Sequence, residues 1–76
     1  SDISFADTFS EKAVIIELKV GYLGSDLVSL SEKALSQIEE KNYAEPFLQN
    51  SMTQSIFAYG IAFSGKNCLV ACKKLK

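Results

Sequence analysis

The sequence predicts an α+β (mixed α/β) fold in the order strand-strand-helix-strand-strand, with one mixed sheet packed on a helix. Three observations predict it. The segment 13–20 is an apolar run of strand length, and 29–43 carries apolar residues at helical spacing. The segment 54–75 holds two runs rich in aromatic and β-branched residues, separated by a short turn. With 76 residues, the chain is at most one domain, 1–76.

The first two expected strands form a hairpin. Residues 1–5 alternate polar and apolar side chains, as in a strand entered midway. The polar stretch 6–12 is expected to be a turn or loop, and the second strand covers 13–20. Because the connection is short, we expect the two strands to pair antiparallel.

The second strand carries two opposite charges inside its apolar run. Side chains alternate across a strand, so Glu17 and Lys19 share one face with Ile15. The other face, which we expect to be the core face, carries Val14, Ile16, Leu18 and Val20. If the first face is covered as well, a partner, a metal ion or water must compensate the burial of the charges.

The expected helix begins at a capping box. Ser29 can accept a hydrogen bond from the Glu32 amide, and Glu32 can reach back to the amide of Ser29. An apolar stripe for the sheet to cover consists of Leu30, Ala34, Leu35 and Ile38. We expect the helix to run to about Asn42 or Tyr43.

The remaining elements follow from one proline and one turn. Because Pro46 biases its predecessor away from the helical region, 44–49 is expected to be a turn or a single helical turn. Strands at 54–63 and 67–75, joined by the turn 64–67, form a second hairpin. The helical crossover between the second and third strands allows these two to pair in parallel.

Charge and cysteine content narrow the function classes. The net charge is −1 and all eight positive charges are lysines, so the whole chain gives no electrostatic argument for strong nucleic-acid binding. With no histidine and no C-x-x-C, the usual structural zinc spacings are absent. Cys68 and Cys72 are expected to be free thiols, as in a reducing compartment. No apolar run approaches the about 20 residues that span a bilayer, so we expect a soluble, cytoplasmic protein without membrane contact.

Asp2, Glu17 and Lys19 have the residue types of a metal-dependent phosphodiesterase. In the expected hairpin, Asp2 lies across from Glu17, so two carboxylates converge. Such a pair suits Mg²⁺ or Mn²⁺, and Lys19 could orient or deprotonate the attacking water or stabilise charge on phosphate. The alternative is that Glu17 and Lys19 lie on a solvent-facing side of the sheet and Asp2 is a frayed terminal residue.

A longer pattern bears on this choice. In order, the chain holds Asp2, then IIELKV at 15–20, ALSQIEEKNYAEPF at 34–47 and YGIAFSGK at 59–66. These four blocks resemble the PD-(D/E)XK nuclease superfamily, and specifically the branch found behind an AAA-ATPase-like domain in many bacterial proteins. The resemblance covers nearly the whole chain.

The resemblance implies a restriction-endonuclease-like core that hydrolyses nucleic acid. On the family's pattern, Asp2 and Glu17 are the metal ligands and Lys19 is the catalytic lysine, while Gln37 and Tyr43 border the site. For these last two, a helix-flank amide and a half-buried ring at the helix end are equally open readings. The family's N-terminal helix and strand are expected to be lacking.

Two further hypotheses remain open. The first is a non-catalytic structural or protein-interaction module derived from the nuclease fold. The second is a homodimer formed through the sheet face or edge that the lacking elements leave open.

Overall fold

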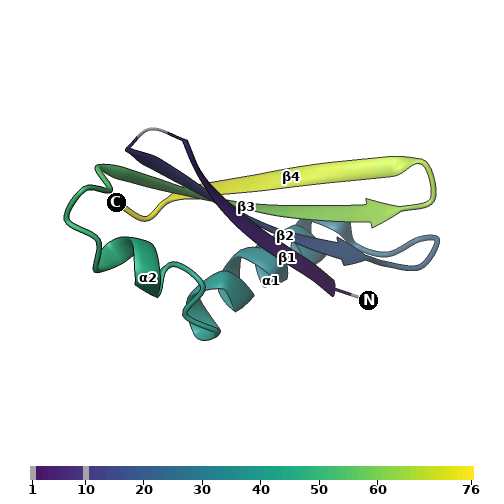
Figure 1. Cartoon of the computed structure of the whole chain (residues 1–76). Helices are drawn as coiled ribbons and strands as arrows, with labels where there is room; N and C mark the ends of the chain where they lie inside the picture. Colours follow the sequence, from purple (N-terminus) through teal and green to yellow (C-terminus); the bar gives the residue numbers. More distant parts are fainter. Residues whose placement is uncertain (1, 10) are drawn as a thin grey trace.

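A computed structural model describes the backbone of residues 2–9 and 11–76 and the side chains of residues 11–76. The elements are β1 (Asp2–Phe9), β2 (Lys12–Val20), α1 (Leu27–Glu40), α2 (Glu45–Leu48), β3 (Ser55–Ser64) and β4 (Asn67–Lys74). This order confirms the predicted fold class. Both helices lie on the same side of the sheet (Figure 1).

The sheet has the strand order β1-β2-β3-β4. β1 and β2 pair antiparallel, as do β3 and β4, whereas the central strands β2 and β3 run parallel. The parallel central pair confirms the crossover expected from the sequence. The expected loop at 6–12 is wrong over its first part, because β1 continues to Phe9, which pairs with Lys12.

The helix α1 begins earlier than the capping box predicts. Its N-cap is Asp26, whose carboxylate accepts hydrogen bonds from the amides of Val28 (3.1 Å) and Ser29 (3.3 Å). Ser29 therefore lies inside the first turn of the helix. An aspartate is as good an N-cap as a serine, and the cap nearer to β2 is the one used. The short helix α2 confirms the single helical turn expected around Pro46.

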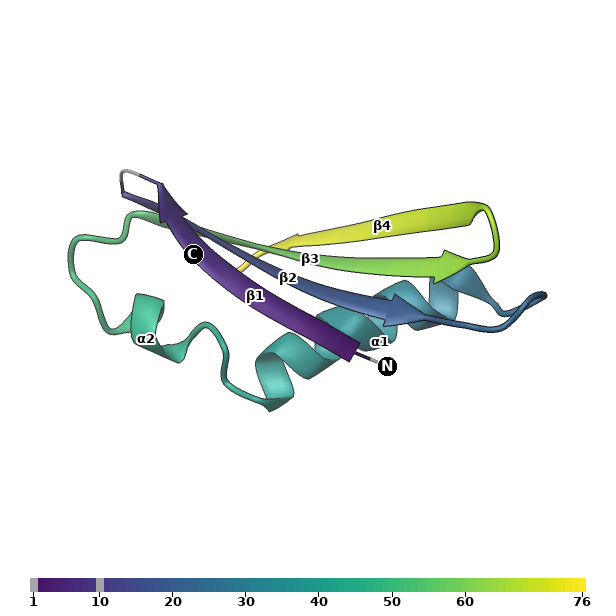
Figure 2. The ribbon, with the colours of Figure 1, turned by 45° about the vertical axis from the view of Figure 1, so that its right-hand side comes forward.

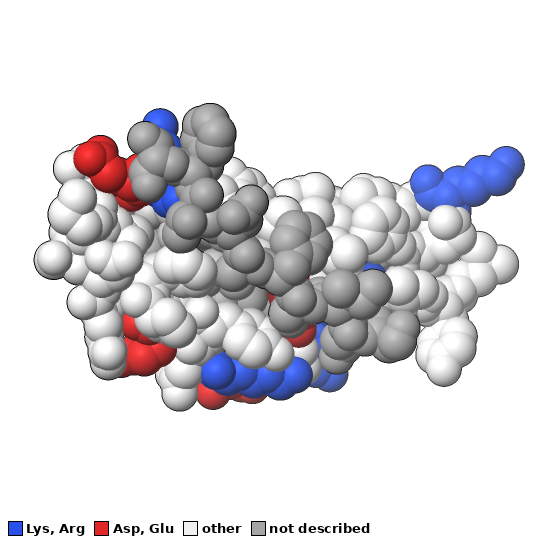
Figure 3. Space-filling view, viewed as in Figure 1, with Lys and Arg blue, Asp and Glu red and all other residues white. Residues whose placement is uncertain are grey.

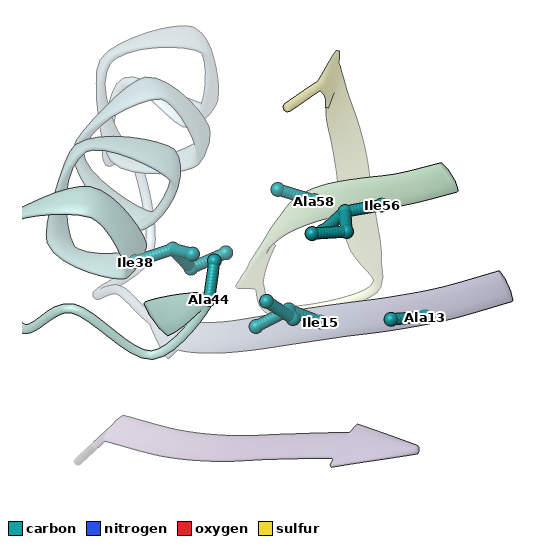
Figure 4. Close-up of a cluster of buried hydrophobic side chains, with 6 residues drawn as sticks. All are labelled: Ala13, Ile15, Ile38, Ala44, Ile56 and Ala58. Atoms are coloured by element: carbon teal, nitrogen blue, oxygen red, sulfur yellow. The ribbon is translucent and has the colours of Figure 1, made fainter. Parts of the chain in front are cut away.

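The core lies between α1 and one face of the sheet. Ile38 and Ala44 point from the helical layer toward Ile15, Ala58 and Ile56 on β2 and β3 (Figure 4). Small side chains on β3 let α1 approach closely, since Ala58, Gly60 and Ala62 alternate along its helix-facing side. Among the helices of the described residues, none is long and apolar enough to cross a membrane.

Candidate active site

Glu17 and Lys19 lie on the covered face of β2. Glu17 is 0% exposed and Lys19 is 8% exposed, and they alternate with the partly exposed Ile16 and Leu18. The expectation that Val14, Ile16, Leu18 and Val20 form the core face is therefore wrong. Strand alternation shows which residues share a face, but the position of α1 decides which face is buried. Full burial of a glutamate and near-full burial of a lysine are rare in proteins.

Gly60 brings the helix backbone next to Glu17. The two residues are paired in the parallel register of β2 and β3. A Cβ atom at Gly60 would lie 2.3 Å from the Ser31 carbonyl oxygen and 2.9 Å from the Leu35 amide nitrogen. The α1 backbone thus rests directly on β3 beside Glu17, which explains why this carboxylate is shielded from solvent.

The β1–β2 register places Asp2 opposite Lys19, whereas Ser4 lies opposite Glu17. The expected pairing of Asp2 with Glu17 is therefore wrong by two residues. The reason is the length of β1, because a hairpin's register is set by its turn, and this turn is tighter than the sequence predicted. Asp2 lies two residues before Ser4 in β1, and its side chain lies outside the described residues.

Gln37 lies on the flank of α1 that faces β2. Glu39, two residues on, is on the opposite flank, where its carboxylate accepts a hydrogen bond from Lys73 of β4 at 2.6 Å. Successive helical residues are rotated by about 100°, so Gln37 falls on the other side of the buried stripe. Its Oε1 atom is buried, and within the described part of the chain it has no hydrogen-bond partner. A buried amide oxygen in this state is a candidate ligand for a water or a cation.

Tyr43 has a packing role. It is partly buried against the hydrophobic cluster, and the Lys41 ammonium lies 6.0 Å from the centre of its ring. These contacts are those of a ring that covers the end of the helix.

The candidate ligands Glu17, Gln37 and Asp2 offer oxygen donors, which suit a hard cation such as Mg²⁺ or Mn²⁺. The described residues contain no group of three or more His, Cys, Asp or Glu side chains that could hold a metal ion. Among the described residues, Glu17 of β2 and Gln37 of α1 each have a buried side-chain oxygen, and the register places the backbone of Asp2 opposite Lys19. This donor set fits a magnesium-type ion.

A groove of about 380 Å³ lies elsewhere, between the end of α1, α2 and β4. Its walls include Ile38, Ala44, Leu48 and Leu75, with Lys73 and Lys74 along β4. Neither Glu17 nor Lys19 lines it. The groove therefore contributes nothing to the candidate site.

Gly60 is the residue of the site that sequence reasoning missed. A glycine inside a strand is a recognised signal of a close backbone approach. The alternation of alanine and glycine at 58–62 was the available sign that this face, and hence the face of Glu17, is covered by a helix.

The buried Glu-x-Lys of β2, under a helix that connects two parallel strands, defines a nuclease-like core. Comparison with protein families gives the same class: residues 1–73 match the model of the PD-(D/E)XK nuclease superfamily. The chain belongs to this superfamily, whose nucleases generally use divalent metal ions. Neither the curated proteins nor the solved structures gave a match.

Proposed function

We propose that this chain is a metal-dependent nuclease core that hydrolyses phosphodiester bonds. The observation that carries the proposal is the burial of Glu17 and Lys19 on the helix-covered face of β2. Burying charged groups costs free energy, and a chain that buries a glutamate and a lysine two residues apart has a reason other than packing to keep them. Membership of the nuclease superfamily supports the same function.

In this proposal each residue has a distinct role. Glu17 and Asp2 hold Mg²⁺ or Mn²⁺, which when bound supplies Lewis-acid stabilisation of the charge that develops on the phosphate. The Lys19 ammonium stabilises a phosphate oxygen or orients the attacking water. The Gln37 amide oxygen accepts a hydrogen bond from that water. The α1 backbone over Gly60 excludes bulk water, which strengthens these electrostatic contacts.

The experiment compares cleavage of a labelled oligonucleotide by the wild-type chain, Glu17→Gln and Lys19→Ala in Mg²⁺ or Mn²⁺. We expect both substitutions to abolish cleavage while circular dichroism shows an intact fold. Glu32→Gln and Lys33→Ala are matched controls, because both residues are exposed on α1, and both should cleave like the wild type. Undiminished cleavage by Glu17→Gln would overturn the proposal.

Metal binding gives a second measurement. Amide NMR shifts on addition of Mg²⁺ should appear around Glu17 and the start of β1, and should vanish in Glu17→Gln. If millimolar metal shifts neither the Glu17 nor the Asp2 amide signal, the proposed metal site is wrong.

We also propose that the chain comes from the branch that follows an AAA-ATPase-like domain in bacterial proteins. The four blocks of the sequence resemblance support it. The gene sequence upstream of Ser1 tests it directly: an ATPase-like segment there is expected, and an unrelated one would contradict the assignment.

A second candidate function is a non-catalytic interaction module that forms a homodimer. The sheet face opposite α1 carries Phe57, Tyr59, Ile61 and Phe63 of β3, and among the described elements no helix covers it (Figure 1). Phe63 is exposed and the other three are partly exposed, and an apolar face that no element covers can bind a partner. Sedimentation should then show a dimer that Ile61→Lys dissociates, and a monomer at high concentration would count against it.

A further inference from the structure

The loop between β2 and α1 presents two large apolar side chains to solvent. Tyr22 is 89% exposed and Leu23 is 90% exposed. Single exposed apolar residues are common, but an adjacent aromatic and aliphatic pair at a loop tip, with almost no intramolecular contact, is a typical contact element for a partner. In Figure 2 this loop lies at the arrowhead end of β2, at the same end of the sheet as the β3–β4 turn.

The backbone of this loop is held by hydrogen bonds. The Gly21 amide donates to the Phe63 carbonyl at 2.7 Å. The Tyr22 carbonyl accepts from the Ser64 hydroxyl at 2.5 Å and from the Ser25 amide at 2.9 Å, and the Tyr22 amide donates to the Ser25 hydroxyl at 2.7 Å. The exposure of the two side chains is therefore built into the fold, and a partner would meet a preorganised element.

The loop leaves β2 directly after the candidate site. Tyr22 follows Lys19 by three residues, so their Cα atoms are at most about 11 Å apart. Successive bases of one nucleic-acid strand are separated by about 3.4 Å. A strand held by its phosphate at Lys19 thus has bases within reach of Tyr22, at most about three steps away.

One lysine beside the loop is placed where it could contact a phosphate. Lys66 is exposed in the neighbouring β3–β4 turn, where a Cβ atom at Gly65 would contact Leu23 at 3.5 Å. The nearby Asp26 carboxylate is engaged by the first amides of α1. In the view of Figure 3 the right-hand end of the molecule shows blue and white atoms but no red ones.

We propose that Tyr22 and Leu23 form a wedge that stacks on, or inserts between, bases of the nucleic-acid strand whose phosphate is held by the Lys19 ammonium. The inference rests on the proposed nuclease function and adds a base-contacting element to it. Aromatic rings stack on any base, and apolar side chains such as leucine open base steps. The contact selects for the presence of bases and is tolerant of their sequence.

Binding is measured in EDTA, so that metal-dependent hydrolysis does not occur, by fluorescence anisotropy of a labelled oligonucleotide. The double variant Tyr22→Ala/Leu23→Ala should bind about tenfold or more weakly, and Tyr22→Phe should bind like the wild type. An oligomer of the same length made of abasic sites should bind the wild type and the double variant equally. Met52→Ala is the matched control, because Met52 is 68% exposed in the loop between α2 and β3.

A second readout detects stacking directly. The fluorescence of 2-aminopurine placed in the oligonucleotide should change on binding of the wild type and should stay unchanged with the double variant. Equal affinities of the two proteins for the normal oligonucleotide would overturn the wedge, as would an equal loss on the abasic one. An effect of the double variant on self-association or liposome binding in place of oligonucleotide affinity would also overturn it.

The wedge and the nuclease proposal fail separately. If cleavage depends on Glu17 but oligonucleotide affinity does not depend on Tyr22 and Leu23, only the wedge proposal is wrong. If the two residues bind bases but no divalent metal ion supports cleavage, only the proposed nuclease activity is wrong.

Discussion

Glu17 on β2 and Gly60 on β3 are register partners, and the backbone of α1 lies directly over Gly60. The space that a side chain would take at Gly60 is occupied by the Ser31 carbonyl and the Leu35 amide. The burial of the candidate catalytic carboxylate therefore depends on the lack of a Cβ atom on the neighbouring strand.

Gly60→Ala should destabilise the fold by about 1–3 kcal/mol or more, because the new methyl group meets main-chain atoms that cannot rotate away. Urea denaturation measures the change. Gly24→Ala is the comparison: Gly24 has open space but φ +86°, so a cost of about 1–2 kcal/mol from backbone strain alone is expected. A Gly60→Ala protein as stable as the wild type would show that α1 does not approach β3 this closely.

Asp26→Ala should cost about 1 kcal/mol of unfolding free energy, because two amides at the start of α1 lose their acceptor. Ser29→Ala should change stability by less than about 0.5 kcal/mol, since exposed substitutions away from caps have small effects. Thermal or urea unfolding of the two variants checks this order. A larger loss of stability in Ser29→Ala than in Asp26→Ala would show that Ser29, and not Asp26, caps the helix.

Manganese should stabilise the chain through Glu17. A ligand that binds only the folded state at a hundred times its Kd adds about 2.7 kcal/mol of stability. Urea denaturation with and without Mn²⁺ should show this gain in the wild type and in Glu32→Gln, but not in Glu17→Gln. An equal gain in Glu17→Gln would place the metal elsewhere.

Ser64→Ala should loosen the Tyr22 loop. The Ser64 hydroxyl is buried and donates to the Tyr22 carbonyl, so its loss leaves that carbonyl with one donor fewer, at a cost of about 1 kcal/mol. Hydrogen exchange at the Gly21 and Ser25 amides should become faster. Ser36→Ala, on the exposed side of α1, is the control, and unchanged exchange in Ser64→Ala would mean that this hydrogen bond does not fix the loop.

The order of the elements was predictable from the sequence because each has its own local pattern. The alternating strands, the helical stripe around Ala34 and Ile38, and the turn before Asn67 need no tertiary information. The helical crossover between β2 and β3 allowed a parallel pairing of these strands, because a connection through a helix can return the chain to the end of the sheet where the first strand began.

The buried face of β2 was not predictable from its own residues. Counting apolar side chains favours the face of Val14, Ile16 and Leu18, whereas the structure covers the face of Glu17 and Lys19. The deciding information lies on β3, where small residues admit the helix. The predicted pairing of Asp2 with Glu17 was wrong because the register depends on the length of the turn. The polar residues 6–12 do not show where that turn begins and ends.

Of the candidate site, Glu17, Lys19 and Gln37 were identified in advance by residue type and by the family resemblance. The structure adds that the first two are buried and that the third has a buried amide oxygen. The roles of all three, and of Asp2, remain predictions that the variants above test.

The alternation of side chains along β3 does not by itself determine the register between β3 and β2, but Gly60 does. Sliding β3 along β2 by two residues would keep every side chain on its present face, but Ala58 or Ala62 would then take the place of Gly60 beneath Ser31 and Leu35. Either methyl group would collide with the helix backbone where Gly60 now fits. The missing Cβ atom of Gly60 therefore fixes the register between β2 and β3. It also fixes the position of Glu17 relative to α1.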